Sequence, residues 1–166
     1  GATNSSLFKA YGSGSRSTDG SYVELKDACR LWQDYNIGAS YYGITSLYYN
    51  SEAVSVTGSA GLPNHGMAIR LVKDSTTLSN GQFGLYRGND GSYYPTICIG
   101  TQEWLHSNLI ETKYRNGDSI PEVADNLQWS ALTSGALCAY NNDWNNIDYE
   151  YIETNYFPHE PPWYIY

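Results

Sequence analysis

The sequence predicts a strand-rich α+β fold, and three features of its 166 residues lead to that prediction. Glycine-bearing turn signals recur along the chain, short runs rich in β-branched and aromatic residues lie between them, and helical segments are scarce. The turn signals are Thr18-Asp19-Gly20, Ser79-Asn80-Gly81, Asn89-Asp90-Gly91 and Arg115-Asn116-Gly117-Asp118. Each suits a tight turn in which glycine takes a positive φ, so the chain should reverse direction at these points.

Several segments between the turns have the composition of strands. They are residues 21–25, 43–49, 53–57, 67–72, 84–87 and 94–100. In 67–72 apolar residues dominate and Arg70 is the one charge among them. That pattern predicts a strand that lies largely inside the protein.

Helix is expected in at most two places. Residues 126–134 are the stronger candidate, because Asp125 can cap the first turn and Gly135 can end the helix in a left-handed conformation. Residues 102–109 are the weaker candidate. Before both helix candidates, the polar residues 75–81 resemble a linker that divides the chain into residues 1–74 and residues 82–166. We expect the two parts to pack together as one compact unit.

Composition narrows the class of partner. The formal net charge of -8 opposes binding to nucleic acid or to anionic lipid, which both require clustered Lys and Arg. The sequence has no stretch of about 20 apolar residues, so direct membrane insertion is not expected. Aromatic residues make up 15% of the chain, including 17 Tyr and 5 Trp. Such residues fit a recognition surface, although they can equally fill the core of a β-rich domain.

No catalytic motif, metal site or cofactor site is predicted. His65, His106 and His159 are far apart, and the chain lacks the motifs of zinc enzymes and of serine hydrolases. The asparagine-rich residues 141–148 could offer oxygen ligands to calcium, but they match only the beginning of an EF-hand loop. A turn held by its own side-chain hydrogen bonds is the preferred interpretation. Three scattered cysteines do not form a disulfide framework and are expected to be small, partly buried residues.

The second half of the chain resembles a known family. Ile99-Gly100-Thr101-Gln102-Glu103-Trp104-Leu105, residues 107–109, 112–118 and 120–121, and then residues 129–136 and 138–143, resemble the opening of the Fibrobacter succinogenes major paralogous domain. The first half resembles the closing part of the same family, over residues 1–5, 19–21, 46–50 and 65–74. The order is therefore that of a fragment spanning two adjacent modules, or of a rearranged single unit.

The resemblance implies a fold similar to that of C-type lectins and formylglycine-generating enzymes, in proteins of bacterial surfaces and phage adhesins. The chain also resembles the variable proteins of diversity-generating retroelements, in which a variable stretch precedes a segment like residues 66–74. Residues 31–51 occupy that position, and they are rich in Tyr, Asn and Ser. Tyrosine gives contact area at low entropic cost, and small polar residues adapt their hydrogen bonds.

These observations predict a non-enzymatic ligand- or receptor-binding module of a bacterial surface or phage tail adhesin, located outside the cell, on its surface or on a virion. The expected partner is a protein or glycan receptor on a host or target cell, and a homo-oligomer is an open alternative. The expected ligand-binding residues are Trp32, Gln33, Asp34, Tyr35, Asn36, Tyr41, Tyr42, Tyr48 and Asn50. The alternative function is an architectural subunit of a fibre, pilus or virion, whose aromatic residues would be buried against neighbouring subunits.

Overall fold

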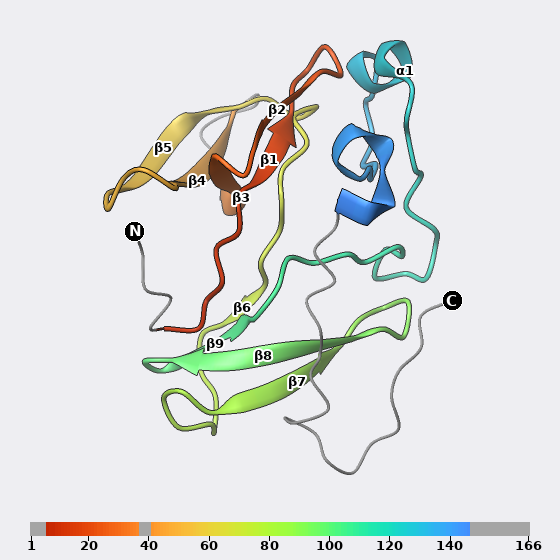
Figure 1. Ribbon diagram of the computed structural model, residues 1–166. Helices are drawn as coiled ribbons and strands as arrows, with labels where there is room; N and C mark the ends of the chain where they lie inside the picture. Colours follow the sequence, from red (N-terminus) through yellow and green to blue (C-terminus); the bar gives the residue numbers. More distant parts are fainter. Residues whose placement is uncertain (1–5, 37–40, 147–166) are drawn as a thin grey trace.

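The computed structural model describes residues 6–36 and 41–146, except for the side chains of residues 35, 36 and 57–60. This part of the chain forms two sheets that lie one above the other, with the short helical segments beside them (Figure 1). The strand-rich α+β class predicted from the sequence is confirmed.

The first sheet contains five strands in the order β2-β1-β3-β4-β5. Their bounds are Ser13–Arg16 for β1, Tyr22–Leu25 for β2, Ala28–Asn36 for β3, Tyr42–Tyr48 for β4 and Val54–Gly61 for β5. Neighbours are antiparallel except β1 and β3, which pair in parallel at Gly14 and Cys29.

The second sheet contains four antiparallel strands in the order β6-β9-β8-β7. Their bounds are Val72–Lys73 for β6, Phe83–Arg87 for β7, Tyr93–Ile99 for β8 and Gln102–Leu105 for β9. The helical segments that follow are α1 (Asn126–Ser130) and the 3₁₀ turns η1 (Tyr140–Asn142) and η2 (Trp144–Asn146). Residues 75–81, the predicted linker, join β6 to β7 within this one sheet, and the Thr76 hydroxyl donates a 2.8 Å hydrogen bond to Glu103 of β9.

The glycine-bearing turns are where the sequence places them. Gly20, Gly81, Gly91 and Gly117 have φ values of 88°, 83°, 94° and 91°. A side chain at these angles would be strained, so the glycines account for the chain reversals. The strands predicted at 21–25, 43–49, 53–57, 84–87 and 94–100 are confirmed as β2, β4, β5, β7 and β8, with shifted ends.

The helix predicted at 102–109 is wrong, because this segment begins with β9. Gly100 has a φ of 66°, and the chain reverses there so that Ile99 pairs with Gln102. Trp104 and Leu105 then pair with Ile97 and Thr96 of β8. The apolar spacing resembles a helix, but the hairpin turn and the pairing with β8 determine the structure.

The buried strand predicted at 67–72 is also wrong. The segment is extended, yet its pairing is limited to isolated bridges near Gly66 and Ala68 and to the two residues of β6. Ile69 and Leu71 are exposed, while Arg70 is buried. Arg70 can be buried because its guanidinium group donates hydrogen bonds to four oxygen acceptors.

The predicted N-cap of α1 is confirmed and its predicted end is wrong. The Asp125 carboxylate accepts a 2.8 Å hydrogen bond from the Gln128 backbone N–H. The helix ends at Ser130 with Ala131 as C-cap, well before Gly135. The Gly135 carbonyl instead accepts a 2.9 Å hydrogen bond from the Tyr114 hydroxyl. A helix of this length depends on tertiary contacts, chiefly those of the buried Trp129.

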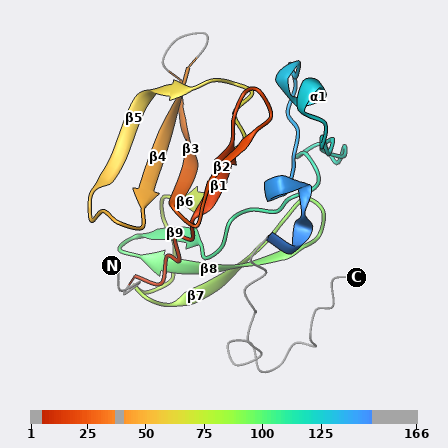
Figure 2. The ribbon, with the colours of Figure 1, turned by 45° about the horizontal axis from the view of Figure 1, so that its top comes forward.

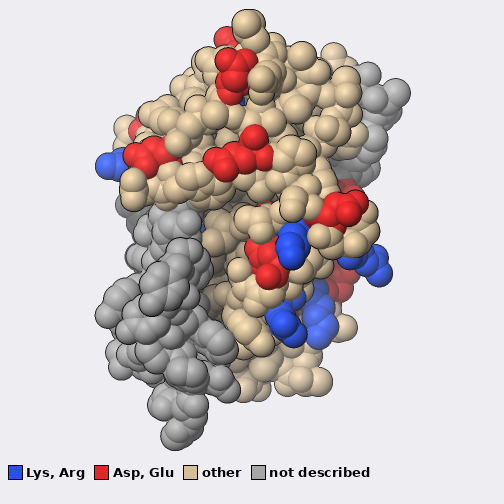
Figure 3. Space-filling view, turned by 90° about the vertical axis from the view of Figure 1, so that its right-hand side faces the viewer, with Lys and Arg blue, Asp and Glu red and all other residues tan. Residues whose placement is uncertain are grey.

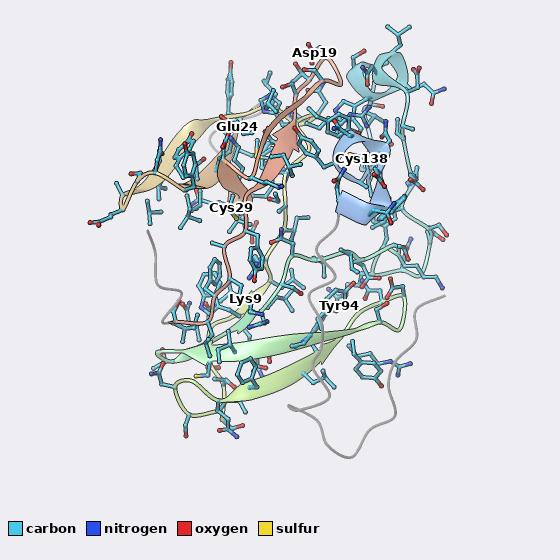
Figure 4. The ribbon with its side chains drawn as sticks, in the orientation of Figure 1. Lys9, Asp19, Glu24, Cys29, Tyr94 and Cys138 are labelled. Atoms are coloured by element: carbon cyan, nitrogen blue, oxygen red, sulfur yellow. The ribbon has the colours of Figure 1, made fainter. Side chains whose placement is uncertain are left out.

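Buried residues lie on both faces of each sheet. Cys29 projects from the first sheet toward the second (Figure 4), and Leu31 of the same strand is buried as well. Cys29 and Leu31 are on one face of β3, whereas Ile44 of β4 lies opposite Trp32 and is on the other face. Ile97, Cys98 and Leu105 are the buried apolar residues at the centre of the second sheet. There the consecutive buried residues Ile97 and Cys98 of β8 point to opposite faces.

The described thiols are free. Cys29 and Cys98 are buried and Cys138 is half-buried, which agrees with the burial predicted for the cysteines.

Candidate functional site

The predicted site residues converge on the β3–β4 pair of the first sheet. Trp32 lies opposite Ile44, so the two side chains are on the same face of the sheet. Tyr42 and Tyr48 are two and four residues from Ile44 in β4, and the two-residue period of a strand places both on that face. Register therefore brings Trp32, Tyr42 and Tyr48 to one surface, which we call the aromatic face.

Trp32 and Tyr42 form the centre of this face. Their rings meet edge to face, with centroids 5.9 Å apart and planes at 82°. Gly61 of β5 lies under the Trp32 ring, and a Cβ at Gly61 would overlap with that ring. Both aromatic side chains are half-buried, so one part of each is supported by the sheet and another part is open to solvent.

A depression of about 240 Å³ lies at this pair. It is lined by Trp32, Gln33, Tyr42 and Pro63. Pro63 is not among the predicted site residues, because nothing in the sequence indicated that the 61–64 turn returns to β3. A rigid aromatic pair beside an open hollow is suited to contact with an apolar or ring-shaped group of a ligand.

Other predicted residues differ in accessibility. Tyr41 is 46% exposed, and Asp34 and Asn50 are exposed. The Gln33 amide donates a 2.9 Å hydrogen bond to the Thr45 hydroxyl, which fixes this side chain across β3 and β4. The backbone of Asn36 lies opposite Tyr42, whereas the side chains of Tyr35 and Asn36 lie outside the described residues.

Tyr48 belongs to a charged group at the other end of the aromatic face. Arg30 donates two hydrogen bonds to the Glu24 carboxylate, at 2.5 and 2.9 Å, and a third at 3.3 Å to the Tyr48 hydroxyl. The hydrogen bonds from Arg30 hold the pKa of Glu24 below its ordinary value. Tyr48 is thus engaged within the protein, and the accessible part of the site is nearer Trp32, Tyr41 and Tyr42.

Charge is nearly absent from the segment that carries most of this surface. Glu52 is the one charged residue between positions 35 and 69, in a chain that has 9 Lys and Arg and 17 Asp and Glu. We call residues 35–69 the neutral segment. In its described part Val54 and Val56 are 55% and 62% exposed. The signal that reveals this segment is in the sequence itself, as a window with almost no charged residues.

The asparagine-rich turn is held by its own side chains, as predicted. The Asp143 carboxylate accepts hydrogen bonds of 2.9 and 2.8 Å from the backbone and side-chain nitrogens of Asn145. The Asn146 amide donates to the Tyr140 carbonyl at 3.1 Å. Asp148 lies outside the described residues. Within 6–36 and 41–146, the structure contains no group of three or more His, Cys, Asp or Glu arranged to hold a metal ion.

No helix in the described part of the chain is both long enough and apolar enough to span a membrane. Searches against family models, curated proteins and solved structures found no match to this chain.

Proposed function

We propose that this protein is a non-enzymatic recognition module with a C-type-lectin-like fold, carried by an adhesin of a bacterial surface or a phage tail. The module acts outside the cell, on its surface or on a virion, and its partner is a protein or glycan receptor on a target cell. The observation that carries the proposal is the supported, half-open pair of Trp32 and Tyr42 beside the depression.

Three properties of this surface support recognition. The aromatic pair is held by Gly61 and by strand pairing, so little side-chain freedom is lost on binding. Exposed Tyr41 and Asp34 are next to Tyr42 and two residues from Trp32 in the chain, respectively, and they offer polar groups that can form hydrogen bonds. Exposed Asn50 lies beyond the other end of β4. The near absence of charge in the neutral segment favours a partner that is recognised by stacking and hydrogen bonding rather than by ion pairs.

The alternative, an architectural subunit of a fibre, pilus or virion, is favoured by the exposed Val54 and Val56. Such residues would be covered in an assembly. The two functions differ in their prediction for Trp32: a recognition site keeps it accessible after assembly, whereas an architectural contact covers it.

The test compares two tryptophans. Labelled protein is applied to an array of immobilised oligosaccharides and to a panel of intact bacterial cells, and Trp32→Ala is compared with Trp144→Ala. Trp144 is also half-buried but lies in η2, so it controls for the loss of an indole group. We expect Trp32→Ala to weaken binding by about 1 to 3 kcal/mol, roughly 5- to 150-fold.

Protease treatment of the cells separates the two receptor classes, because it removes protein receptors and leaves glycans. Thermal melts of both variants show whether a loss of binding comes from unfolding. Equal binding by the two variants, or binding no stronger than that of an unrelated protein of similar charge, contradicts the proposal.

A further inference from the structure

The outer edge of β5 differs from the other sheet edges. In the described residues β2 and β5 are the edges of the first sheet, and β6 and β7 are the edges of the second (Figure 2). Three of these strands carry a charged residue, namely Glu24 in β2, Lys73 in β6 and Arg87 in β7. β5 has none. Charged side chains on edge strands prevent pairing between molecules, so β5 lacks this protection.

The side chains of β5 also favour pairing. Val54 lies opposite Leu47 and Val56 opposite Thr45, so the two valines are on the face of the sheet away from Trp32 and Tyr42. They are more than half exposed. The register shifts beyond Thr57, which confines regular strand geometry to residues 54–57 and limits the length that can pair.

We propose that two copies of this chain pair antiparallel through the outer edges of their β5 strands. An open strand edge is its own complement under a twofold axis perpendicular to the sheet. In the register that sets Ser55 against the partner's Ser55, each Val54 lies opposite the partner's Val56. The four valines then form one apolar stripe, in which each cross-strand pair stabilises the dimer.

The distribution of charged residues favours a second copy of the chain as the partner at this edge. Two chains of net charge -8 repel, and they can approach most readily where neither presents charged groups. Glu52 is the one charge in the neutral segment, and it lies outside the paired residues. By contrast, acidic and basic side chains are spread over the face on the side of α1 (Figure 3). Pairing at β5 uses one edge from each copy, so the assembly closes at two subunits.

Dimerisation at β5 has a consequence for the aromatic face. The twofold axis keeps the Trp32 and Tyr42 pairs of both copies on the same side of the joined sheet. Two identical sites would then face one target surface, and binding to a surface with repeated receptors would gain avidity. The dimer itself does not depend on the proposed function, and it is tested separately.

The experiment is sedimentation velocity of the full chain over a concentration series. We expect a reversible monomer–dimer equilibrium, and we expect the Val54→Lys/Val56→Lys variant to weaken it more than tenfold, because four lysines would meet at the paired edges. Val23→Lys is the matched control, since Val23 is 39% exposed on β2, the opposite edge of the same sheet. Thermal melts exclude unfolding as the cause.

A crosslinking measurement fixes the register. In a Cys138→Ser background, Ser55→Cys should form an intermolecular disulfide under mild oxidation, because directly opposed residues are close enough to bridge. Ser51→Cys, exposed but outside β5, is the control. A chain that stays monomeric at millimolar concentration overturns the proposal. So does a dimer that both lysine variants leave unchanged, or one that Ser51→Cys crosslinks as readily as Ser55→Cys.

Discussion

The neutral segment nearly lacks charged side chains, whereas the contacts that join the first sheet to the rest of the chain are built around charged ones. Residues 35–69 carry one charged side chain, Glu52, and leave Val54, Val56 and Tyr41 in solvent. The joining contacts instead depend on two buried guanidinium groups, those of Arg16 and Arg70. The exposed side chains of the neutral segment are available to a partner. The residues around Arg16 and Arg70 are instead constrained, because they must supply hydrogen-bond acceptors to a buried cation.

Arg16 connects the β1–β2 hairpin to the segment that leads into α1. Its side chain is 1% exposed and donates hydrogen bonds to the carbonyl oxygens of Gly20, Val123 and Ala124, at 3.0, 2.6 and 2.8 Å. A fourth bond, of 3.0 Å, goes to the Asn126 side chain. The Trp129 ring lies 4.2 Å from the guanidinium carbon, within the range of a cation–π contact.

Arg70 performs the same task between the sheets. It donates hydrogen bonds to the backbone carbonyls of Phe8, Lys9 and Leu105, at 2.6, 2.7 and 3.0 Å, and one of 2.7 Å to the Asn108 side chain. Burial lowers the pKa of Arg70 to about 10, so the group remains charged at neutral pH. In both cases oxygen dipoles, rather than carboxylates, accept the hydrogen bonds of the cation.

The largest effect should come from Arg16→Met. The substitution removes the donor from the Gly20 and Val123 carbonyls and from the Asn126 side chain, while the Ala124 carbonyl keeps a 3.1 Å hydrogen bond from the Asn142 amide. We expect the free energy of unfolding to fall by about 3 to 5 kcal/mol. Chemical denaturation measures it. Arg87→Met is the control, because Arg87 is exposed and its guanidinium carbon lies over the Tyr93 ring, 5.8 Å from the ring centre. Similar losses in both variants would show that burial of Arg16 has no special role.

Arg70→Met should have the second largest effect, about 2 to 4 kcal/mol, because Arg70 is 8% exposed and its site is more open. Arg70→Lys should recover little of this loss, since one ammonium group cannot reach four acceptors arranged around a planar guanidinium. Denaturant unfolding of the two variants measures how much of the lost stability lysine restores. Full recovery by lysine would mean that charge alone matters and that the four-way geometry does not.

Local features of the fold could be predicted from the sequence, while features that depend on distant partners could not. The turns at Gly20, Gly81, Gly91 and Gly117 and the Asp125 cap follow from neighbouring residues, and they were predicted correctly. The burial of Arg70 and the β9 hairpin depend on residues far along the chain, and there the apolar pattern was misleading. Strands β1 and β3 went unpredicted, because their mixed polar and apolar residues have no clear period.

The candidate site likewise combines residues that the sequence identified with residues that only the fold brings to it. Trp32, Tyr41 and Tyr42 were identified by composition and position, and strand register brings Trp32 and Tyr42 into contact. Pro63 and Gly61 arrive from β5 and the turn after it, which residue type alone could not reveal. The binding role of these residues remains a prediction.

The effect of removing the α1 cap should be intermediate. Asp125→Ala removes the carboxylate that accepts from the Gln128 N–H, and we expect a loss of about 1 kcal/mol. Leu127→Ala, at an 80% exposed position in the same helix, should change stability by less than about 0.5 kcal/mol. Because Trp129 of α1 packs on Arg16, Asp125→Ala combined with Arg16→Met should destabilise less than the sum of the two. Strict additivity would mean that α1 and the Arg16 contact are independent.

The smallest effect is expected in a comparison of two glutamates, Glu103 in β9 of the second sheet and Glu52 in the neutral segment. Glu103 accepts hydrogen bonds of 2.6 and 2.8 Å from the Thr96 and Thr76 hydroxyls, and these, with Lys73 nearby, hold its pKa below the ordinary value of 4.5. A carboxyl whose folded-state pKa is depressed contributes stability above its unfolded pKa and loses that contribution as pH falls through the folded value. Glu103→Gln should therefore lower stability by about 0.5 to 1 kcal/mol near neutral pH and flatten its decline below about pH 4.5. Glu52→Gln, the same change at the one charge of the neutral segment, should change stability by less than about 0.5 kcal/mol near neutral pH, because Glu52 is exposed. If Glu52→Gln lowered stability as much as Glu103→Gln, charge in the neutral segment would have a structural role, and the contrast between the neutral segment and the rest of the chain would fail.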